Sequence, residues 1–364
     1  MQIHLVIPGL IWPGISAISP ASGLELPALA RMLGLGRHRM APFEPLDHQL
    51  ARLFGYVTPA SESDSLPLAA LRRLGEPSMP APDVNSQWLC ADPVNLSFAR
   101  EHLLLNEFPA DGLDPAEVAA LIASLNETFP DLGRFEACTP TRWYLHLAAA
   151  THAKLFPLHD VIGRPIKDFL PEGNDARLWQ RTLNEAQVLL HNHPVNQARE
   201  ASGRRPANSL WFWGAGMLRP GTACSLSTVQ SREPLTRGLA RAAGVTVNEP
   251  DCREALKQDT LIVLDSLLKP SLQLDIDSWR ACLVELERDW FAPISDSLRT
   301  KRLHTLTLTA PGDRGTLELL ARATDGWKFW RKPLAFDALL KSLSPSPIQL
   351  PGQSPGTTSE YPAR

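Results

Sequence analysis

Short apolar runs rich in β-branched residues recur along the chain and alternate with stretches of helical periodicity. The runs occupy residues 3–7, 209–213, 245–247, 261–264 and 303–308, and Gly, Pro or Asp residues bound them. Near-continuous apolar runs of this length are typical of parallel strands that are buried on both faces. Residues 26–33, 235–243 and 278–291 predict helices between them. The alternation predicts a doubly wound α/β body with a mostly parallel sheet.

The length and the middle of the chain predict a second domain. The 364 residues are about 2.4 times a typical domain of ~150 residues. A predicted strand at 102–108 is followed by Asp114 and Glu117, spaced as a capping box, and by an apolar helical face that ends at Phe129. We therefore predict an inserted α+β domain at 91–204 within a discontinuous core of residues 1–90 and 205–342. The Ser-, Pro- and Gly-rich residues 343–364 predict a disordered tail.

Charge and cysteine usage restrict the partners. Lys and Arg number 36 against 39 Asp and Glu, so a net charge of −3 gives no global basic field for nucleic acid or a membrane, and we expect neither partner. Any anion site must then be local. The five cysteines are single and lie outside zinc spacing, which predicts neither a metal nor another cofactor. The absence of a signal-like start predicts a cytoplasmic protein. Trp327 and Trp330 can share one helix face, for which we expect burial.

The densest group of basic residues lies between residues 193 and 219. Arg199, Arg204, Arg205 and Arg219 against Glu200 give this stretch a local charge of +3. The planar guanidinium group suits a carboxylate or a phosphate. The glycines at 214 and 216 follow a predicted strand and would allow a ligand to approach the backbone. The alternative is a solvated arginine turn beside core tryptophans.

A second candidate consists of Arg142 and the pair His159 and Asp160. A histidine titrates near neutrality, and a neighbouring carboxylate can orient it for binding phosphate or donating a proton. The alternative is a loop hydrogen-bonding pair. His191 and His193 predict a helix end. The sequence contains no GxxxxGK[ST], GxGxxG, GxSxG or HExxH motif, so only such constellations indicate a site.

The order of these motifs resembles a known family. Asn-x-x-Arg at 196–199, Pro-Ala-Asn at 206–208 and Trp-x-Trp-Gly-x-Gly at 211–216 are similar to the archaeal-type cofactor-independent phosphoglycerate mutases, and more closely to bacterial RpfE-type regulatory proteins. The resemblance spans roughly residues 3–331 and implies an alkaline-phosphatase-like core with an inserted substrate domain. It also implies an anion-binding series that consists of Arg142, His159, Asp160, Asn196, Arg199, Arg205 and Asn208.

The reaction centre that the resemblance implies is incomplete. The family chemistry uses a serine nucleophile and two divalent metals held by Asp and His. Gly9 stands where the family has a metal-binding Asp, and Leu46 stands where it has the serine. Asp265 and Asp313 lack the histidines expected near them. We therefore predict no catalytic or metal-binding residue.

The leading hypothesis is a degenerate regulatory protein that binds a small anionic metabolite similar to 3-phosphoglycerate. An active mutase or related phosphotransferase, with Ser63, Ser65 or Asp47 as the nucleophile, is one alternative. The other is a structural or partner-binding protein in which the arginines only bridge the two domains. The sequence does not identify a protein partner.

Overall fold

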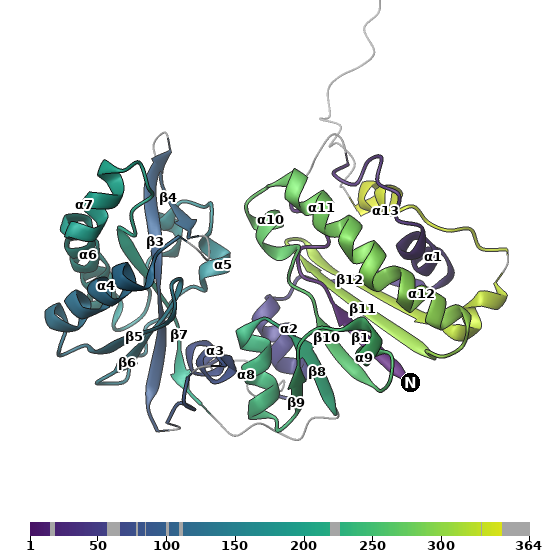
Figure 1. Ribbon diagram of the computed structural model, residues 1–364, viewed down its shortest axis with the longest axis horizontal. Helices are drawn as coiled ribbons and strands as arrows, with labels where there is room; N and C mark the ends of the chain where they lie inside the picture. The colour runs from purple at the N-terminus through teal and green to yellow at the C-terminus, as the bar shows by residue number, and fades with distance from the viewer. Residues whose placement is uncertain are drawn as a thin grey trace, which may run out of the picture.

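The computed structural model describes residues 1–14, 19–56, 66–77, 79–83, 85–99, 102–108, 112–218, 226–328 and 330–343. Figure 1 shows two lobes, which are the core and the inserted domain. Ser63, Ser65, Arg219 and the predicted tail beyond residue 343 lie outside the described residues.

The core contains a seven-stranded sheet in the order β2-β12-β11-β1-β10-β8-β9. The pairs β1 with β10, β1 with β11, β10 with β8 and β8 with β9 are parallel, while β12 and β2 are antiparallel at one edge. The predicted α/β class with a mostly parallel sheet is confirmed. The strands are β1 (Gln2–Val6), β2 (Arg37–Ala41), β8 (Thr228–Ser231), β9 (Thr246–Asn248), β10 (Thr260–Val263), β11 (Thr305–Gly312) and β12 (Gly315–Arg322).

Helices cover both faces of this sheet. Ile3 and Leu5 of β1 pack in one apolar cluster with α1, α11, α12 and α13, whereas Val6 packs in a second cluster with α2, α3 and α8. Side chains alternate between these faces because successive residues of a strand point in opposite directions. The core helices are α1 (Pro27–Leu35), α2 (Leu46–Leu53), α3 (Leu68–Gly75), α8 (Pro234–Ala242), α9 (Cys252–Ala255), α10 (Leu268–Leu272), α11 (Ile276–Leu286), the π-helical turn η3 (Glu287–Phe291), α12 (Ala292–Arg299), the 3₁₀ turn η4 (Ala323–Trp327) and α13 (Phe336–Leu343).

The inserted domain is an antiparallel sheet in the order β4-β3-β6-β5, with β7 also paired to β3. Helices α4, α6 and α7 lie together on one side of it (Figure 1). The predicted capping box of Asp114 and Glu117 is present at the start of α4. The elements are β3 (Gln87–Ala99), β4 (His102–Glu107), α4 (Pro115–Thr128), β5 (Gly133–Thr139), β6 (Arg142–Leu147), α5 (Leu158–Val161), the 3₁₀ turn η2 (Ile166–Phe169), α6 (Ala176–Asn192), α7 (Pro194–Ala201) and β7 (Ser209–Met217).

The second boundary of this domain differs from the predicted one at 204. Strand β7 was expected to begin the returning core, but it pairs with β3 from Gln87 opposite Met217 to Val94 opposite Ser209. The hydrogen bonds therefore place residues 209–217 in the inserted sheet. An apolar run carries the signal for a buried strand without encoding which sheet it joins, since that choice depends on contacts distant in sequence.

Helix α3 joins the two lobes, and glycines permit its close approach. A Cβ atom on Gly214 would lie 2.9 Å from the backbone nitrogen of Ala69, and one on Gly216 would lie 2.8 Å from Cα of Pro67. Both glycines therefore allow α3 and the residue before it to pack closely on β7. The start of α3, and not a ligand, fills the space beside them. Trp211 and Trp213 are buried, as the core alternative predicted, and the guanidinium group of Arg72 in α3 lies 5.0 Å from the centre of the Trp213 ring.

The prediction that Trp327 and Trp330 are buried is wrong. Their exposed fractions are 73% and 67%, because the segment between β12 and α13 is a 3₁₀ turn with an irregular continuation rather than a packed helix. None of the described helices is long and apolar enough to cross a bilayer.

Candidate functional site

A histidine of the inserted domain meets a buried acid of the core where the two lobes face each other. His159 lies in α5, and its Nε2 atom is 3.7 Å from Oδ1 of Asp47 and 3.7 Å from Oδ1 of Asp160. Asp47 lies in the first turn of α2 with a side chain that is 6% exposed. Burial raises the pKa of Asp47, and the nearby His159 opposes that rise. Two of the predicted ligand residues, His159 and Asp160, therefore lie near Asp47, which directly follows the position expected for the nucleophile.

A buried ion pair lies behind this contact. Arg72 of α3 donates two hydrogen bonds to Asp92 of β3, at 2.7 and 2.6 Å, and a third to the hydroxyl of Tyr144 at 3.0 Å. Trp213 Nε1 donates to the same aspartate at 3.0 Å, and the ring of His159 stands edge-on to Trp213 at 6.4 Å. This ion pair was not among the predicted site residues. The signal was a pair of arginines inside the short apolar stretch at 68–75.

Arg142 belongs to the same polar network rather than to an open anion site. Its guanidinium group forms a bidentate pair with Glu76, at 2.6 and 2.9 Å, and Glu76 also accepts a hydrogen bond from Tyr144. Burial alone would raise the pKa of Glu76, but the bonds from Arg142 and Tyr144 hold it below its ordinary value. Glu76 directly follows α3, so Arg142 connects the inserted sheet to that helix.

Arg199 is buried inside the inserted domain. It donates to Glu117 at 2.6 Å and to the carbonyls of Gly112 and Arg205 at 2.5 and 2.8 Å. These hydrogen bonds connect α7 to the first turn of α4 and to the loop that precedes β7. We expected Arg142 and Arg199 to converge around one ligand. The described contacts do not bring them together, because Arg142 pairs with Glu76 and Arg199 pairs with Glu117.

The two predicted asparagines bind backbone. Asn196 donates to the carbonyls of Leu190 and Ala207 and accepts from the amide of Ala207. Asn208 donates to the carbonyl of Leu96 at 3.0 Å and accepts from its amide at 2.8 Å. Both side-chain amides thus bind backbone groups within the inserted domain. The Asn-x-x-Arg and Pro-Ala-Asn motifs thus encode the local fold of the inserted domain.

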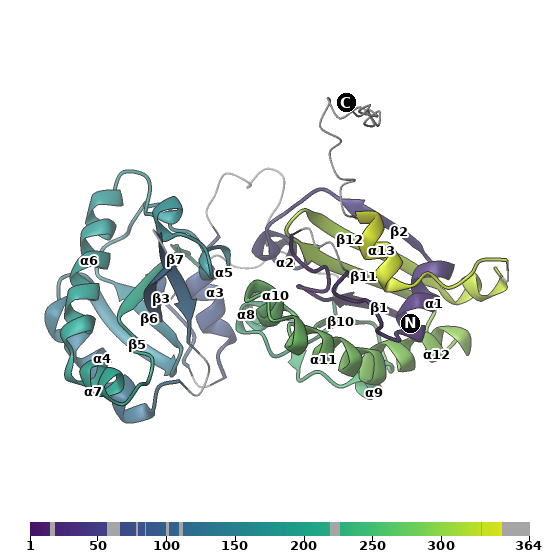
Figure 2. The same cartoon turned by 90° about the horizontal axis from the view of Figure 1, so that it is seen from above.

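Arg205 is exposed and lies at a second contact between the lobes. Its Nη1 atom is 3.5 Å from the carbonyl oxygen of Glu107, the last residue of β4, and the Glu107 carboxylate is 3.4 Å from Nζ of Lys269 in α10. Burial raises the pKa of Glu107, and Lys269 opposes that rise. The amide of Gly163, just after α5, donates to the carbonyl of Leu105 in β4, so α5 and β4, which carry His159 and Glu107, are neighbours. Figure 2 shows α5 on the side of the inserted domain that faces the core.

The donor set does not fit the two metals that the resemblance implies. The described residues contain no group of three or more His, Cys, Asp or Glu side chains able to hold a metal ion. Gly9 has a φ angle of +79°, and a Cβ atom there would lie 2.5 Å from the carbonyl oxygen of Leu267, so no carboxylate can stand at this position. Asp313 accepts a hydrogen bond from the amide of Gly14, which gives it a structural role.

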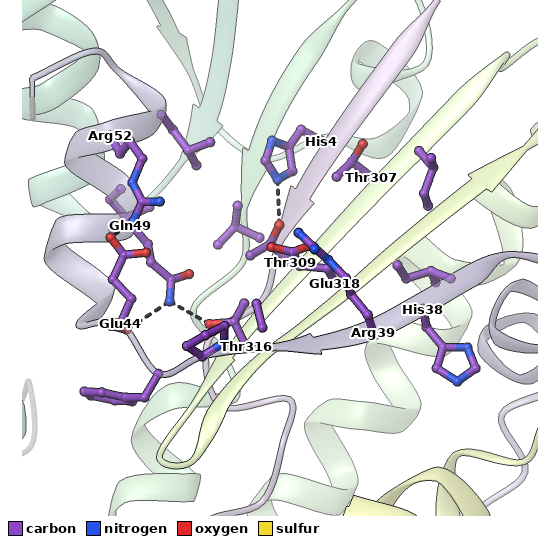
Figure 3. Close-up of a pocket in the computed structure, with 18 of the residues that line it drawn as sticks. His4, His38, Arg39, Glu44, Gln49, Arg52, Thr307, Thr309, Thr316 and Glu318 are labelled. Carbon is purple, nitrogen blue, oxygen red and sulfur yellow. Dashed lines mark hydrogen bonds and ion pairs between the residues drawn. The ribbon is translucent and has the colours of Figure 1, made fainter. Parts of the chain in front are cut away.

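A separate cavity of about 900 Å³ lies on the face of the core sheet beside α2 (Figure 3). His4 bonds to Thr309 at 2.8 Å, and Gln49 donates to Thr316 at 2.7 Å. Burial lowers the pKa of His4 to about 4, so its imidazole is neutral at pH 7. The lining also includes the charged side chains of Glu44, Arg52 and Glu318, so the cavity presents both neutral and charged polar groups. The missed sequence signal was the alternation of threonines with leucines at 305–309.

The fold and the joint define a two-lobed α/β protein with an inserted antiparallel domain, and known proteins share sequence with that domain. The family model described as 2,3-bisphosphoglycerate-independent phosphoglycerate mutase matches residues 91–196. A mutase of that name from Methanothrix thermoacetophila is 34% identical over 113 residues, which are 31% of this chain and 29% of the relative. One from Methanosarcina mazei is 31% identical over 160 residues, 41% of this chain and 40% of the relative.

A longer match reaches into the core. A Geobacter sulfurreducens protein, which carries the same name with the qualifier "Probable", is 29% identical over 255 residues, 64% of this chain and 60% of its own. The chain thus spans less than two thirds of the length of these relatives. Among solved structures, a cofactor-independent phosphoglycerate mutase from Thermoplasma acidophilum aligns with a TM-score of 0.44 and 17% identity over 88% of each chain. A Pyrococcus horikoshii protein aligns with a TM-score of 0.49 and 15% identity over 88% of this chain and 87% of its own.

Proposed function

We propose that this chain is a phosphoglycerate-mutase-like protein that binds a small phosphorylated or carboxylated metabolite between its lobes and acts in regulation rather than catalysis. The observation that carries the proposal is the identity of the first two residues of α2, Leu46 and Asp47. Leu46 stands at the position expected for the nucleophile, and the adjacent Asp47 is buried against His159. The resemblance to RpfE-type proteins supports the regulatory role.

The chemistry of phosphoryl transfer supports the loss of catalysis. Transfer depends on a positioned nucleophile and on cations that neutralise the charge on the phosphoryl oxygens. Gly9 cannot carry a ligand side chain, and Asp313 bonds to backbone instead. Binding and orientation alone would leave the reaction many orders of magnitude slower than in an enzyme with these groups.

The charges on the edge that carries α5 and β4 support an anionic ligand. Arg205 from the inserted domain and Lys269 from the core both lie at Glu107. A ligand carboxylate or phosphate could replace the Glu107 carboxylate beside Lys269 and receive a bidentate contact from Arg205. Such a ligand would contact both lobes at once, and the half-buried His159 lies on the same edge.

Thermal unfolding with and without 3-phosphoglycerate tests the binding. A ligand that binds only the folded state raises the free energy of unfolding, by about 2.7 kcal/mol when its free concentration is 100 times Kd, and Tm rises with it. We expect Arg205→Gln and Lys269→Gln to reduce this shift, while Arg181→Gln, which removes an exposed arginine on α6, leaves it unchanged. No shift with any phosphorylated three-carbon acid would contradict metabolite binding. In a coupled assay with manganese, turnover of 3-phosphoglycerate above about 1 per second, within the ordinary enzyme range, would contradict the regulatory role.

The contact between Asp47 and His159 favours one alternative, a phosphotransferase with a carboxylate nucleophile. An oxygen of Asp47 would attack phosphorus and form an acyl phosphate, while the departing alkoxide would take a proton from His159. Intact-mass measurement after incubation with a phosphoglycerate tests this step. A hydroxylamine-sensitive phosphate adduct on the parent protein, absent from Asp47→Asn, would establish the alternative over the regulatory proposal.

A further inference from the structure

The end of the core that is distant from the inserted domain carries an aromatic and basic surface that the mutase resemblance does not use. We propose that this surface docks on a membrane that contains anionic phospholipids. It consists of Trp327, Trp330, Lys301, Arg302, Arg331 and Lys332, which we call the tryptophan–arginine patch. The proposal is independent of whether the joint between the lobes binds a metabolite.

Contacts on the core hold the patch together. The Nζ atom of Lys301 lies 5.8 Å from the centre of the Trp327 ring. Arg331 donates to the carbonyl of Gly36 at 3.0 Å, which fixes the segment after η4 against the end of α1. The side chains of Trp327 and Trp330 are mostly exposed, at 73% and 67%. The protein therefore presents two indoles at a fixed site instead of packing them in a core.

Three more arginines surround the base of the patch. Arg31, Arg299 and Arg322 line one small hollow between α1, α12 and β12. With Lys328 and the patch itself, these described residues comprise eight basic side chains, and the acidic side chains beside them are Asp296 and Asp325. Their local charge is +6, whereas the whole chain has a charge of −3. The near-neutral total had suggested that no membrane would be attracted, but the opposite charges lie elsewhere on the molecule.

Exposed indoles beside lysine and arginine match the chemistry of an anionic bilayer surface. Tryptophan is enriched at the headgroup level of membranes because its ring is mostly apolar and its N–H group is polar. Basic side chains near the surface are attracted by anionic headgroups within about one Debye length, ~10 Å at 0.1 M salt. The combination accounts for why two large aromatic side chains remain exposed among cations.

The shape of this region favours a bilayer over single-stranded nucleic acid. Nucleic-acid channels combine a basic groove with aromatic platforms on which bases stack. Here the segment between β12 and α13 forms a protruding tip in both views (Figure 1 and Figure 2), and the hollow beside it has a volume of only about 30 Å³. A tip can enter a headgroup layer while the joint, at the other side of the core, stays accessible.

Vesicle co-sedimentation of the full chain tests the proposal. We expect binding to vesicles of phosphatidylcholine mixed with phosphatidylglycerol, little binding to pure phosphatidylcholine, and release as salt increases. The double variant W327A/W330A should weaken binding at least tenfold, and K301Q/R302Q/K332Q should reduce both the affinity and its dependence on salt. These side chains are exposed, so circular dichroism and Tm should match those of the parent protein.

The matched control is Phe98→Ala. Phe98 is an aromatic residue of the inserted domain with an exposed fraction of 82%, and its loss should leave vesicle binding unchanged. The proposal is overturned if the parent protein does not sediment with anionic vesicles at low salt, or if W327A/W330A binds them as well as the parent. It is also overturned if labelled single-stranded DNA binds at the patch and anionic vesicles do not.

Discussion

The ion pair between Arg72 and Asp92 connects α3 to the inserted sheet, and its removal gives the sharpest test of how the lobes are held. The substitution Arg72→Met keeps most of the apolar stem and deletes the charge. Among the described residues, Asp92 would then keep the hydrogen bonds from the amide of Trp143 and the indole of Trp213. The side chain of Asp92 is 1% exposed, so water cannot replace the lost guanidinium group without rearrangement.

The magnitude follows from this burial. Removing one partner of a buried ion pair typically costs about 3–5 kcal/mol, because the other charge is left without compensation. The bidentate geometry and the additional bond from Arg72 to Tyr144 place the expected cost within that range. An exposed pair on one helix is worth only about 0.3–0.5 kcal/mol. Arg181 and Glu185 of α6, which are 79% and 46% exposed, form such a pair.

Urea unfolding followed by tryptophan fluorescence measures the difference. We expect Arg72→Met to lower the free energy of unfolding by about 3–5 kcal/mol, and Arg181→Met to change it by less than about 0.5 kcal/mol. The double variant R72M/D92N should recover part of the loss, since no ionised aspartate then remains in the apolar joint. A cost for Arg72→Met no larger than that for Arg181→Met would refute the reasoning that a buried charge pair holds the joint.

Two other substitutions test the site and the packing of α3. Asp47→Asn should stabilise the protein at neutral pH, because burial raises the pKa of Asp47 above its usual 3.8 and the free energy of unfolding falls as pH rises from 3.8 through that raised pKa. The gain should vanish below pH 3.8, and Asp131→Asn, at an exposed aspartate of the inserted domain, should give none. Urea midpoints at both pH values measure it. Gly238→Ala should cost at least about 1–3 kcal/mol, since its Cβ would lie 1.7 Å from a carbonyl oxygen of α3, whereas Gly326→Ala, with open space, should be nearly neutral in thermal unfolding.

Much of the core could be predicted because its signals are local. The apolar runs at 3–7 and 303–308 correspond to β1 and β11, and the capping box at Asp114 marks the start of α4. The run at 209–213 gave the correct element in the wrong sheet. Pairing between β7 and β3 joins residues more than 110 positions apart, and an apolar strand can satisfy its hydrogen bonds in either sheet.

The candidate site was less predictable for a related reason. A composition of arginines, histidines and asparagines indicates polar chemistry but not the partner of each side chain. Arg199 and Asn196 lie in motifs that resemble a binding series, yet their donors are directed to Glu117 and to backbone carbonyls. The sequence had no direct signal for the pairing of Arg72 with Asp92, since the two residues lie in different elements that meet only in the tertiary structure.

The joint around α3 and the contact between Glu107 and Lys269 together restrict how a ligand could act. The joint around α3 combines a buried ion pair with glycine contacts to α8, so a movement about this helix would expose a charge pair and break close packing. The contact between Glu107 and Lys269 is different, because Lys269 is about half exposed and screened by solvent. An anion that binds Lys269 would displace the Glu107 carboxylate while the α3 joint stays closed. Regulation by such a ligand would therefore change the surface near β4 and α10 rather than swing one lobe against the other.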